Sequence, residues 1–377
     1  MTDLPTGAVT TEVTAPICII AFDRPDYLRR LCLSLKAQRG VHIAEHRIHL
    51  IQDGAVSPRS GIAYAEPEKT AASIAAFREV FPGGVVHVSA DNLGIAMNIR
   101  RAEHLAFVEQ VAPLAYFFED DLELSPFYMA MMERLRVLLE PHPNVGYFAA
   151  YGYHQTAADP QAPRLVGLGQ LWGFGLFRHC WEAMRPMLAP FFDIYARTDY
   201  QMRPQRRLME LFREKQLSAH ATSQDAVRAV VCAELGFARI TTDVCYARYI
   251  GERGANFSPE IFAARGYDCM AFVDHLPARM PEATPGKIAE IHTGQREFWA
   301  QHRREHFDAQ LAQLQATTFD SDRLVTREEV EWLWRLLLDR VPPEDYLAEA
   351  VGRHSLQTVR RDILRSPEAR AKCRHMV

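Results

Sequence analysis

Three consecutive acidic residues, Glu119, Asp120 and Asp121, stand at the end of an apolar and aromatic run within residues 114–124. A short apolar run bounded by prolines is typical of a strand that is buried on both faces. Adjacent carboxylates repel one another, so a positive group is expected beside them. Sites made of oxygen ligands favour Mg²⁺ or Mn²⁺. These ions are commonly bound by protein carboxylates together with the phosphate oxygens of a substrate. The pattern predicts a divalent-cation site; the alternative is that these acids or Ser125 cap the next helix.

Two earlier predicted strands, over 15–22 and 47–51, also end in polar residues. Asp23 and Arg24 follow the first strand, and Asp53 follows the second. The carboxyl ends of parallel strands lie at one edge of a sheet, where open α/β sheets bind ligands, so these side chains are expected to face one cleft. The polar residues after any one of these strands can also be explained as an ordinary turn, because Asp and Gly favour turns. Their recurrence after successive strands is what favours a shared site.

The elements that position these residues alternate between strand and helix. Strands are expected over 15–22, 47–51, 85–88 and 114–118, and helices over 27–35, 65–81 and 95–111. This alternation predicts an α/β fold with a mainly parallel sheet flanked by helices. No Gly-x-Gly-x-x-Gly follows the first strand and no phosphate-binding P-loop is present, which argues against a dinucleotide-binding fold and a P-loop NTPase.

The second half of the chain offers two weaker signals. A glycine-rich segment surrounds Trp172, whose indole could stack on a sugar or base, or equally pack in the core. An Arg-rich helical excursion over 191–219 presents Arg203, Arg206 and Arg207 on a basic face. This face suits an anionic acceptor or a membrane surface, although such faces are more often simply solvated.

The bulk composition bounds the class of protein. The 377 residues carry a net charge of −4, which gives no support to a nucleic-acid binder. The seven cysteines are scattered without a Cys-x-x-Cys pair, so reduced thiols are expected rather than disulfides or a zinc site. No signal peptide or membrane span is evident. We expect a cytoplasmic protein, with peripheral contact at the inner membrane as an option.

Six motifs along the chain resemble, in order, those of the GT-A-type nucleotide-sugar glycosyltransferases. They are Phe22-Asp23-Arg24-Pro25, Gln52-Asp53-Gly54, Glu119–Glu123, Trp172–Trp181, Ser223-Gln224-Asp225 and Arg248–Asn256. The pattern spans roughly residues 15–265 and is closest to the N-acetylglucosaminyltransferase I type and to related bacterial inverting enzymes of polysaccharide assembly. It implies a GT-A fold that moves a sugar from a nucleotide-sugar, expected to be UDP-linked, to a hydroxyl of a glycan, lipid-linked or protein acceptor in bacterial surface-polysaccharide biosynthesis.

The resemblance also implies a role for each matching residue. Asp121 resembles the one direct protein ligand of Mn²⁺ or Mg²⁺, and Asp225 resembles the catalytic base that deprotonates the acceptor hydroxyl. Asp199 is the reserve candidate for the base, and His275 and His292 are weaker candidates to complete the metal shell. The residues matched to donor binding are Phe22, Arg24, Asp53, Asn92, Gly94, Asp120, Trp172, Gly251, Gly254 and Asn256. Without the resemblance, Asp225 would be an ordinary helix N-cap.

The expected domain organisation follows from the motifs and from a change of character near residue 320. We expect a disordered N-terminus over 1–15, a GT-A domain over 16–319 (donor half 16–124, acceptor half 125–285, helical connector 286–319) and a small helical module over 320–377. An exposed stripe with Trp332 and Trp334 in this module suggests a homo-oligomer or a docking surface.

Elementary chemistry agrees with this function. A departing diphosphate needs a cation as Lewis acid, and the acceptor needs one carboxylate base, so direct displacement would invert the anomeric centre. Two rivals are a sugar nucleotidyltransferase and a non-catalytic nucleotide-sugar or glycan-binding scaffold. The nucleotidyltransferases generally carry a Gly-rich, basic loop after the first strand, where this chain has Phe22-Asp-Arg-Pro.

Overall fold

The computed structural model describes residues 10–152, 158–254, 258–317 and 324–369. The chain forms two compact units. The first contains Met1–Ser57 and Ala63–Phe307, and the second contains Pro58–Ile62 and Asp308–Val377. Asn256, a predicted donor-binding residue, lies outside the described part of the chain.

A mixed sheet forms the centre of the first unit. Its described strands have the order β5-β4-β2-β6-β10-β8-β11-β9. Their bounds are Val85–Val88, Ile48–Gln52, Ile17–Ala21, Leu114–Glu119, Gly173–Phe177, Val145–Ala149, Ala238–Thr242 and Leu165–Gly167, respectively. The strands from β5 to β6 are parallel neighbours, whereas β10 runs antiparallel between β6 and β8. The predicted α/β class, with a mainly parallel sheet flanked by helices, is confirmed.

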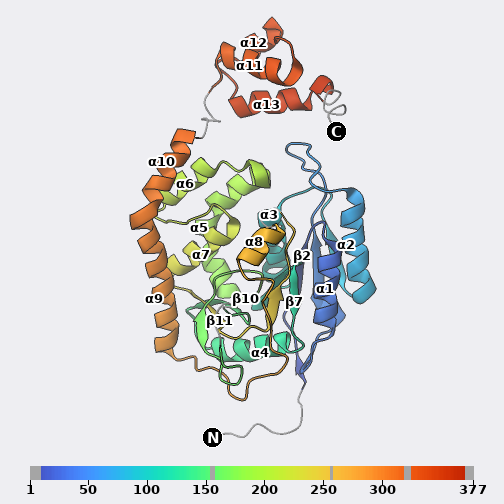
Figure 1. Cartoon of the computed structure of the whole chain (residues 1–377), viewed down its shortest axis with the longest axis vertical. Helices are drawn as coiled ribbons and strands as arrows, with labels where there is room; N and C mark the ends of the chain where they lie inside the picture. The colour runs from blue at the N-terminus through green and yellow to red at the C-terminus, as the bar shows by residue number, and fades with distance from the viewer. Residues whose placement is uncertain (1–9, 153–157, 255–257, 318–323, 370–377) are drawn as a thin grey trace. The chain divides into compact units, whose positions relative to one another are not determined.

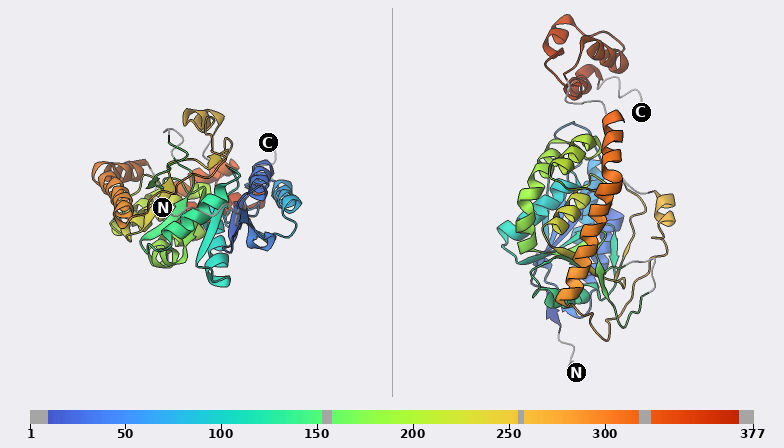
Figure 2. Two further views of the ribbon diagram at one scale, coloured as in Figure 1. Left: turned by 90° about the horizontal axis from the view of Figure 1, so that it is seen from below. Right: turned by 90° about the vertical axis from the view of Figure 1, so that its left-hand side faces the viewer.

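Helices cover both faces of this sheet. α1 (Pro25–Lys36) and α2 (Pro67–Val80) follow β2 and β4 and pack side by side, as Figure 1 shows. After β5 the chain crosses back to β6, so a right-handed crossover places α3 (Ile95–His104) on the opposite face, against β2 and β4. α9 (Pro285–His302) packs on β9 and β11 and is the long orange helix in the right view of Figure 2. None of the described helices is both long enough and apolar enough to cross a bilayer.

The strand order creates a crevice at one edge of the sheet. The chain leaves β2 toward β4 and later returns to β6 on the other side of β2. The carboxyl ends of β2 and β6 therefore frame a topological switch point, which is where open α/β sheets bind ligands. Arg24 follows β2 and the acid triplet ends β6, so the fold brings the first and third polar strand ends together.

The helix after β10 is longer than the range of 178–187 that the sequence predicts. α5 continues from Arg178 to Arg197, past Pro186 and Pro190. Its inward face buries large side chains, namely Met184, Leu188, Phe191, Phe192 and Tyr195. We attribute the continuation to this burial, which offsets the hydrogen bonds that the two prolines remove.

A short ribbon replaces part of a predicted loop. Residues 245–259 are predicted to be irregular, but Ala247–Tyr249 forms β12 and pairs antiparallel with β7, Leu122–Leu124. Strands of three residues carry too little periodicity to be seen in a sequence. The ribbon holds the following residues against the acid triplet, because the Ile250 N–H donates to the Asp121 carbonyl oxygen at 2.9 Å.

The second unit has a small core of its own. It is formed by α11 (Arg327–Leu338), α12 (Glu344–Ala350) and α13 (Leu356–Arg365). Trp334 belongs to this core and is 8% exposed, so the prediction of an exposed Trp332/Trp334 stripe is wrong for Trp334; Trp332 is 61% exposed. Residues 318–323, which include the predicted boundary at 320, lie outside the described residues.

Candidate functional site

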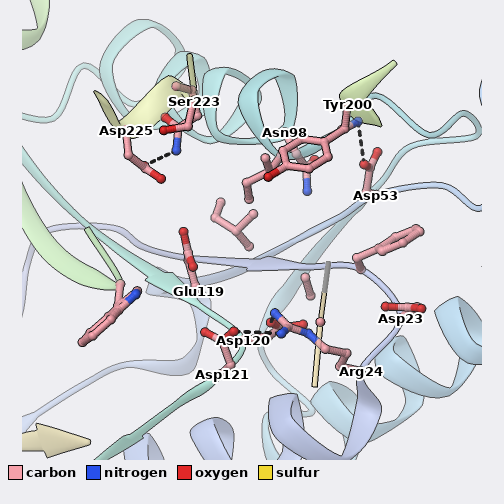
Figure 3. Close-up of a pocket in the computed structure, with 18 of the residues that line it drawn as sticks. Asp23, Arg24, Asp53, Asn98, Glu119, Asp120, Asp121, Tyr200, Ser223 and Asp225 are labelled. Atoms are coloured by element: carbon pink, nitrogen blue, oxygen red, sulfur yellow. Dashed lines mark hydrogen bonds and ion pairs between the residues drawn. The ribbon is translucent and has the colours of Figure 1, made fainter. Parts of the chain in front are cut away.

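A cavity of about 610 Å³ opens at the carboxyl ends of β2, β4 and β6 (Figure 3). Small-molecule sites in proteins typically measure about 300–1,000 Å³. The predicted site residues that line it are Phe22, Arg24, Asp53, Asn92, Gly94, Asp120, Asp121, Trp172, Asp225 and Gly254. In Figure 3, Asp120 and Asp121 lie on one side and Asp225 on the other, with Glu119 between them. The predicted metal ligand and the predicted base therefore share one hollow.

Arg24 provides part of the positive charge that the acid triplet requires. One guanidinium nitrogen donates to Asp121 Oδ2 at 2.8 Å, and the other donates to Asp120 Oδ1. Both carboxylates are 2% exposed. Burial raises the pKa of Asp120 to about 6, the Arg24 guanidinium opposes the rise, and the Asp121 carboxylate adds to it. Arg24 thus bridges Asp120 and Asp121, and it forms no ion pair with Glu119.

The negative charge that Arg24 leaves uncompensated is the observation that supports binding of a metal ion. Asp121 Oδ1 is buried and has no hydrogen-bond partner among the described residues. Burial and the neighbouring Asp121 and Asp225 carboxylates raise the pKa of Glu119 well above its usual range. No group of three or more His, Cys, Asp or Glu side chains within the described ranges could hold a metal by itself. The residues present fit a cation that takes one protein carboxylate and draws its other ligands from a substrate.

Gly251, a predicted donor-binding residue, does not itself line the cavity but packs against two residues that do, Asp121 and Tyr249. A Cβ atom built on Gly251 would lie 2.6 Å from Asp121 Oδ2 and 2.4 Å from the Tyr249 hydroxyl, so any larger residue would collide with both. The adjoining Arg253 anchors the same turn to α1 by donating to Asp26 at 2.7 Å. The backbone after β12 therefore approaches the predicted metal ligand as closely as glycine allows.

Asp53 shapes the part of the cavity next to β4. Its carboxylate accepts the backbone N–H groups of Gly54, Leu93 and Gly94 at 2.8–3.1 Å. Burial raises the pKa of Asp53, and these three hydrogen bonds oppose the rise. The Asn92 amide donates to the Gly54 carbonyl at 2.9 Å, which ties the same turn to β4. In this structure Asp53 fixes the turn before α3, and a contact between Asp53 and a ribose stays a prediction.

Trp172 combines the two roles that its sequence context left open. One face of its ring stacks on Tyr249, with centroids 4.5 Å apart and planes 13° from parallel. Its backbone carbonyl accepts the Glu119 N–H at 2.7 Å, which links β10 to the acid triplet. The side chain is half-buried and lines the cavity. The ring also contacts those of Tyr151 and Tyr267, with centroids 5.6 and 5.4 Å away, so Trp172 both packs in an aromatic cluster and lines the cavity.

Asp225 lies in the first turn of α7 (Gln224–Glu234) and does not cap it. The cap is Ser223, whose hydroxyl accepts the Ala226 N–H at 3.2 Å. The Gln224 amide donates to Asp225 Oδ1, which orients the carboxylate. Burial raises the pKa of Asp225 to about 6, and the nearby Arg228 and Arg203 guanidiniums oppose the rise. The alternative explanation of Asp225 as an N-cap is thereby removed.

Three other candidates from the sequence do not reach the cavity. Asp199 is 3% exposed, and its two oxygens accept the Ser57 hydroxyl at 2.5 Å and the Tyr64 hydroxyl at 3.0 Å. His292 donates to the Ala233 carbonyl oxygen at 2.8 Å, and neither it nor His275 is among the lining residues. Asp199 thus acts as a structural acceptor, and the histidines are not placed to complete a metal shell.

Several residues line the cavity without having been predicted to do so, among them Asn98, Tyr200, Arg203 and Tyr249. Asn98 is the most detectable, because an asparagine at an inward position of a helix needs a buried partner. Its amide donates to the Ile51 carbonyl at 2.8 Å. Tyr200 and Arg203 lie in the segment between α5 and α6 (Gln205–Glu214), where no periodic signal indicates which side chains face the cavity.

A buried ion pair supports the helix that carries Asp225. The two terminal nitrogens of Arg228 on α7 donate to the Glu103 carboxylate on α3, and Arg228 Nε donates to Gln224 Oε1 at 2.7 Å. Arg228 is 1% exposed and Glu103 5% exposed. Gln224 in turn contacts Asp225, so a continuous chain of hydrogen bonds runs from α3 to the cavity.

A Glu103→Gln variant is expected to unfold about 3–5 kcal/mol more easily, because removal of one partner leaves the Arg228 charge buried and uncompensated. Urea unfolding followed by circular dichroism measures the change. The matched control is Glu140→Gln, whose side chain is 58% exposed in its pair with Arg136 and should cost less than about 1 kcal/mol. Equal losses in the two variants would refute the importance of the buried pair.

Comparisons with known proteins do not assign a function to this chain. No protein-family model and no curated protein matches the chain. Residues 1–349 of S. aureus TarS in complex with UDP-GlcNAc are 12% identical, with a TM-score of 0.37, over 98% of this chain and 92% of that chain. A mutant of LgtC is 14% identical, with a TM-score of 0.28, over 49% and 66% of the two chains. A CMP:2-keto-3-deoxy-manno-octonic acid synthetase complexed with CTP is 13% identical, with a TM-score of 0.33, over 68% and 99%. None of these proteins is of the N-acetylglucosaminyltransferase I type, and similarity at this level assigns neither a family nor an activity.

Proposed function

We propose that the protein is a metal-dependent inverting glycosyltransferase of bacterial surface-polysaccharide assembly, which moves a sugar from a UDP-linked donor to a hydroxyl of a glycan, lipid-linked or protein acceptor. The observation that carries the proposal is the cavity in which the carboxylates at the end of β6 face Asp225 at the start of α7. Glycosyl transfer needs both features in one place. The acids prepare a site for a cation and a diphosphate, and Asp225 supplies a base.

The donor would occupy the side of the cavity formed by β2 and β4. Phe22, Arg24 and Asn92 would bound its nucleoside, and Asp53 would hold the turn that shapes this part. Arg24 now engages Asp120 and Asp121, so binding of a nucleotide would compete with these ion pairs. Trp172, which lines the cavity, would contact the sugar. Gly251 and Gly254 would let the backbone approach the diphosphate closely.

Asp121 is the residue that would hold Mn²⁺ or Mg²⁺, because its Oδ1 is buried without a partner among the described residues. The diphosphate and water would supply the other ligands, as is usual for these ions. When bound, the ion supplies Lewis-acid stabilisation of the departing diphosphate. The carboxylate of Asp121 itself orients the donor by fixing where its phosphates can lie.

Asp225 would accept the proton of the acceptor hydroxyl. A general base works best when its pKa lies near the working pH, and a value of about 6 leaves this carboxylate ionised at neutral pH yet basic. The hydrogen bond from Gln224 fixes Oδ1 and thereby the direction of the carboxylate. The acceptor oxygen then attacks the anomeric carbon opposite the diphosphate, so one displacement inverts the configuration.

Calorimetric titration of the full chain with UDP, with and without Mn²⁺, tests the proposal. We expect Mn²⁺ to raise the affinity for UDP by about 5- to 150-fold, the range of ordinary coupling between two ligands. Uridine, which lacks the diphosphate, serves as the control and should show no dependence on the ion. Nucleotide binding that ignores Mn²⁺ would favour a non-catalytic scaffold.

A hydrolysis screen then separates the two classes of enzyme. A glycosyltransferase should slowly hydrolyse its own donor within a panel of nucleotide-sugars, in the presence of Mn²⁺ or Mg²⁺, and release the nucleoside diphosphate. Release of pyrophosphate from a nucleoside triphosphate and a sugar 1-phosphate would instead identify a nucleotidyltransferase and overturn the proposal.

A further inference from the structure

The basic face predicted within 191–219 separates into two parts in the structure. Arg206 and Arg207 lie on α6 (Gln205–Glu214), where each pairs with a glutamate of the same helix. Arg203, which precedes this helix, instead lines the cavity. The face is therefore not uniformly solvated, because one of its three arginines belongs to the candidate site.

Two tyrosine rings hold the Arg203 guanidinium in place. Its central carbon lies 4.3 Å from the ring centroid of Tyr200 and 4.6 Å from that of Tyr195. Tyr195 is 2% exposed and donates to the Thr222 carbonyl at 2.8 Å, so this ring is itself fixed. Arg203 makes no hydrogen bond or ion pair with the residues that the structure describes. Stacking uses the faces of a guanidinium and leaves its N–H donors for a ligand.

The charges around the cavity indicate what such a ligand must carry. The acidic lining residues are Asp23, Asp53, Glu119, Asp120, Asp121 and Asp225, whereas the basic ones are Arg24 and Arg203. Arg24 is already paired with two of the acids. Within the described wall of the cavity, Arg203 is thus the basic residue without an ion pair. Without the help of a cation, an anionic group could enter this acidic hollow only where Arg203 receives it.

The position of Arg203 assigns it to the acceptor rather than to the donor. In Figure 3, Asp225 lies across the cavity from Asp120 and Asp121, and Tyr200 lies beside Asp53. Arg203 contacts Tyr200 and is close enough to Asp225 to influence its pKa. The donor diphosphate is expected at the opposite acids, so Arg203 stands beside the base and the incoming hydroxyl.

We propose that Arg203 determines acceptor specificity by binding an anionic group, a phosphate or a carboxylate, that the acceptor carries near the hydroxyl to be glycosylated. This inference rests on the proposed glycosyl transfer. It narrows the acceptor to phosphate-linked or uronic-acid-containing glycoconjugates. A neutral glycan would leave the Arg203 donors unsatisfied in the complex, which is costly for a charged group.

Equilibrium dialysis of small labelled anions against the full chain tests the site. Sulfate stands for a phosphate group and acetate for a carboxylate, and saturating UDP and Mg²⁺ fill the donor side. We expect Arg203→Gln to weaken binding of the preferred anion by about 10- to 100-fold, the loss for a charge-assisted hydrogen bond. Arg203→Lys should restore part of the affinity, and the control Arg207→Gln should leave it unchanged.

Two results would overturn the inference. One is an Arg203→Gln variant that binds both anions like the wild type. The other is a variant that loses affinity for UDP as strongly as for the anion, which would place Arg203 at the diphosphate. Failure of the proposed function looks different, since UDP would then not bind or would bind with the same affinity with and without Mn²⁺, and the anions can still be measured without UDP.

Discussion

An Asp121→Asn variant should lose sugar transfer by about a thousandfold or more, together with the Mn²⁺-dependent part of UDP binding. Lewis-acid stabilisation of a leaving group is worth several kcal/mol, and each 1.4 kcal/mol corresponds to about a factor of ten in rate. Asparagine keeps the shape of the side chain but removes the charge that the buried Oδ1 offers to a cation. Donor turnover and Mn²⁺ binding followed by electron paramagnetic resonance measure the two effects separately.

Glu123→Gln is the matched control for this variant. Glu123 lies two residues after Asp121, but its carboxylate pairs with Arg30 and Arg248 and does not line the cavity. Its loss should leave both transfer and Mn²⁺ binding within about threefold of the wild type, because partly exposed ion pairs contribute little. If Asp121→Asn retained Mn²⁺-dependent UDP binding, the cation would have to be held elsewhere and the mechanism would fail.

The sequence predicted the part of the site that depends on strand ends. A buried strand is recognisable from a few apolar residues, and its carboxyl end then follows from the next turn. Arg24, Asp53 and Asp121 were expected to face one cleft because parallel strands end at one edge, and all three line the cavity. This inference needed only the strand order around β2, which right-handed crossovers largely determine.

The sequence could not predict contacts that depend on tertiary packing. The resemblance implies donor binding for Arg24, but nothing in its sequence neighbours indicates that it bridges Asp120 and Asp121, about a hundred residues away in the chain. The orientation of β10, which enters antiparallel between β6 and β8, also has no local signal. Arg203 lines the cavity from the segment after α5, a helix that continues past two prolines, which local propensity disfavours.

The segment that carries Asp225 shows how the two kinds of information combine. Ser223, Gln224 and Asp225 read locally as a helix start, and the helix is found where expected. Packing of α7 against α3 through Arg228 determines which of these three residues caps the helix and which one faces the ligand. The Ser223 hydroxyl caps the helix, the Gln224 amide joins the buried hydrogen-bond network, and the Asp225 carboxylate lines the cavity.

An Asp225→Asn variant should transfer sugar about 10²- to 10⁴-fold more slowly, which is the usual contribution of a general base. Its affinity for UDP and Mn²⁺ should not change, because the carboxylate lies across the cavity from the acids that would hold them. Glu234→Gln, at the far end of the same helix and 50% exposed, is the matched control and should retain full activity. Loss of UDP binding in Asp225→Asn would show that this residue serves the donor instead.

The pH dependence of transfer distinguishes a base from a residue that only positions the acceptor. The pKa of Asp225 is raised to about 6 by burial, so the base becomes protonated below that pH, and kcat/KM should fall about tenfold for each further pH unit. Above pH 6 the carboxylate is ionised and the rate should level off. The pKa of Asp120 is also about 6, so the wild-type profile alone does not identify the group. The pH profile of the residual activity of Asp225→Asn identifies the group. The fall in kcat/KM below pH 6 should disappear if Asp225 is the base, and it should remain if Asp120 causes it.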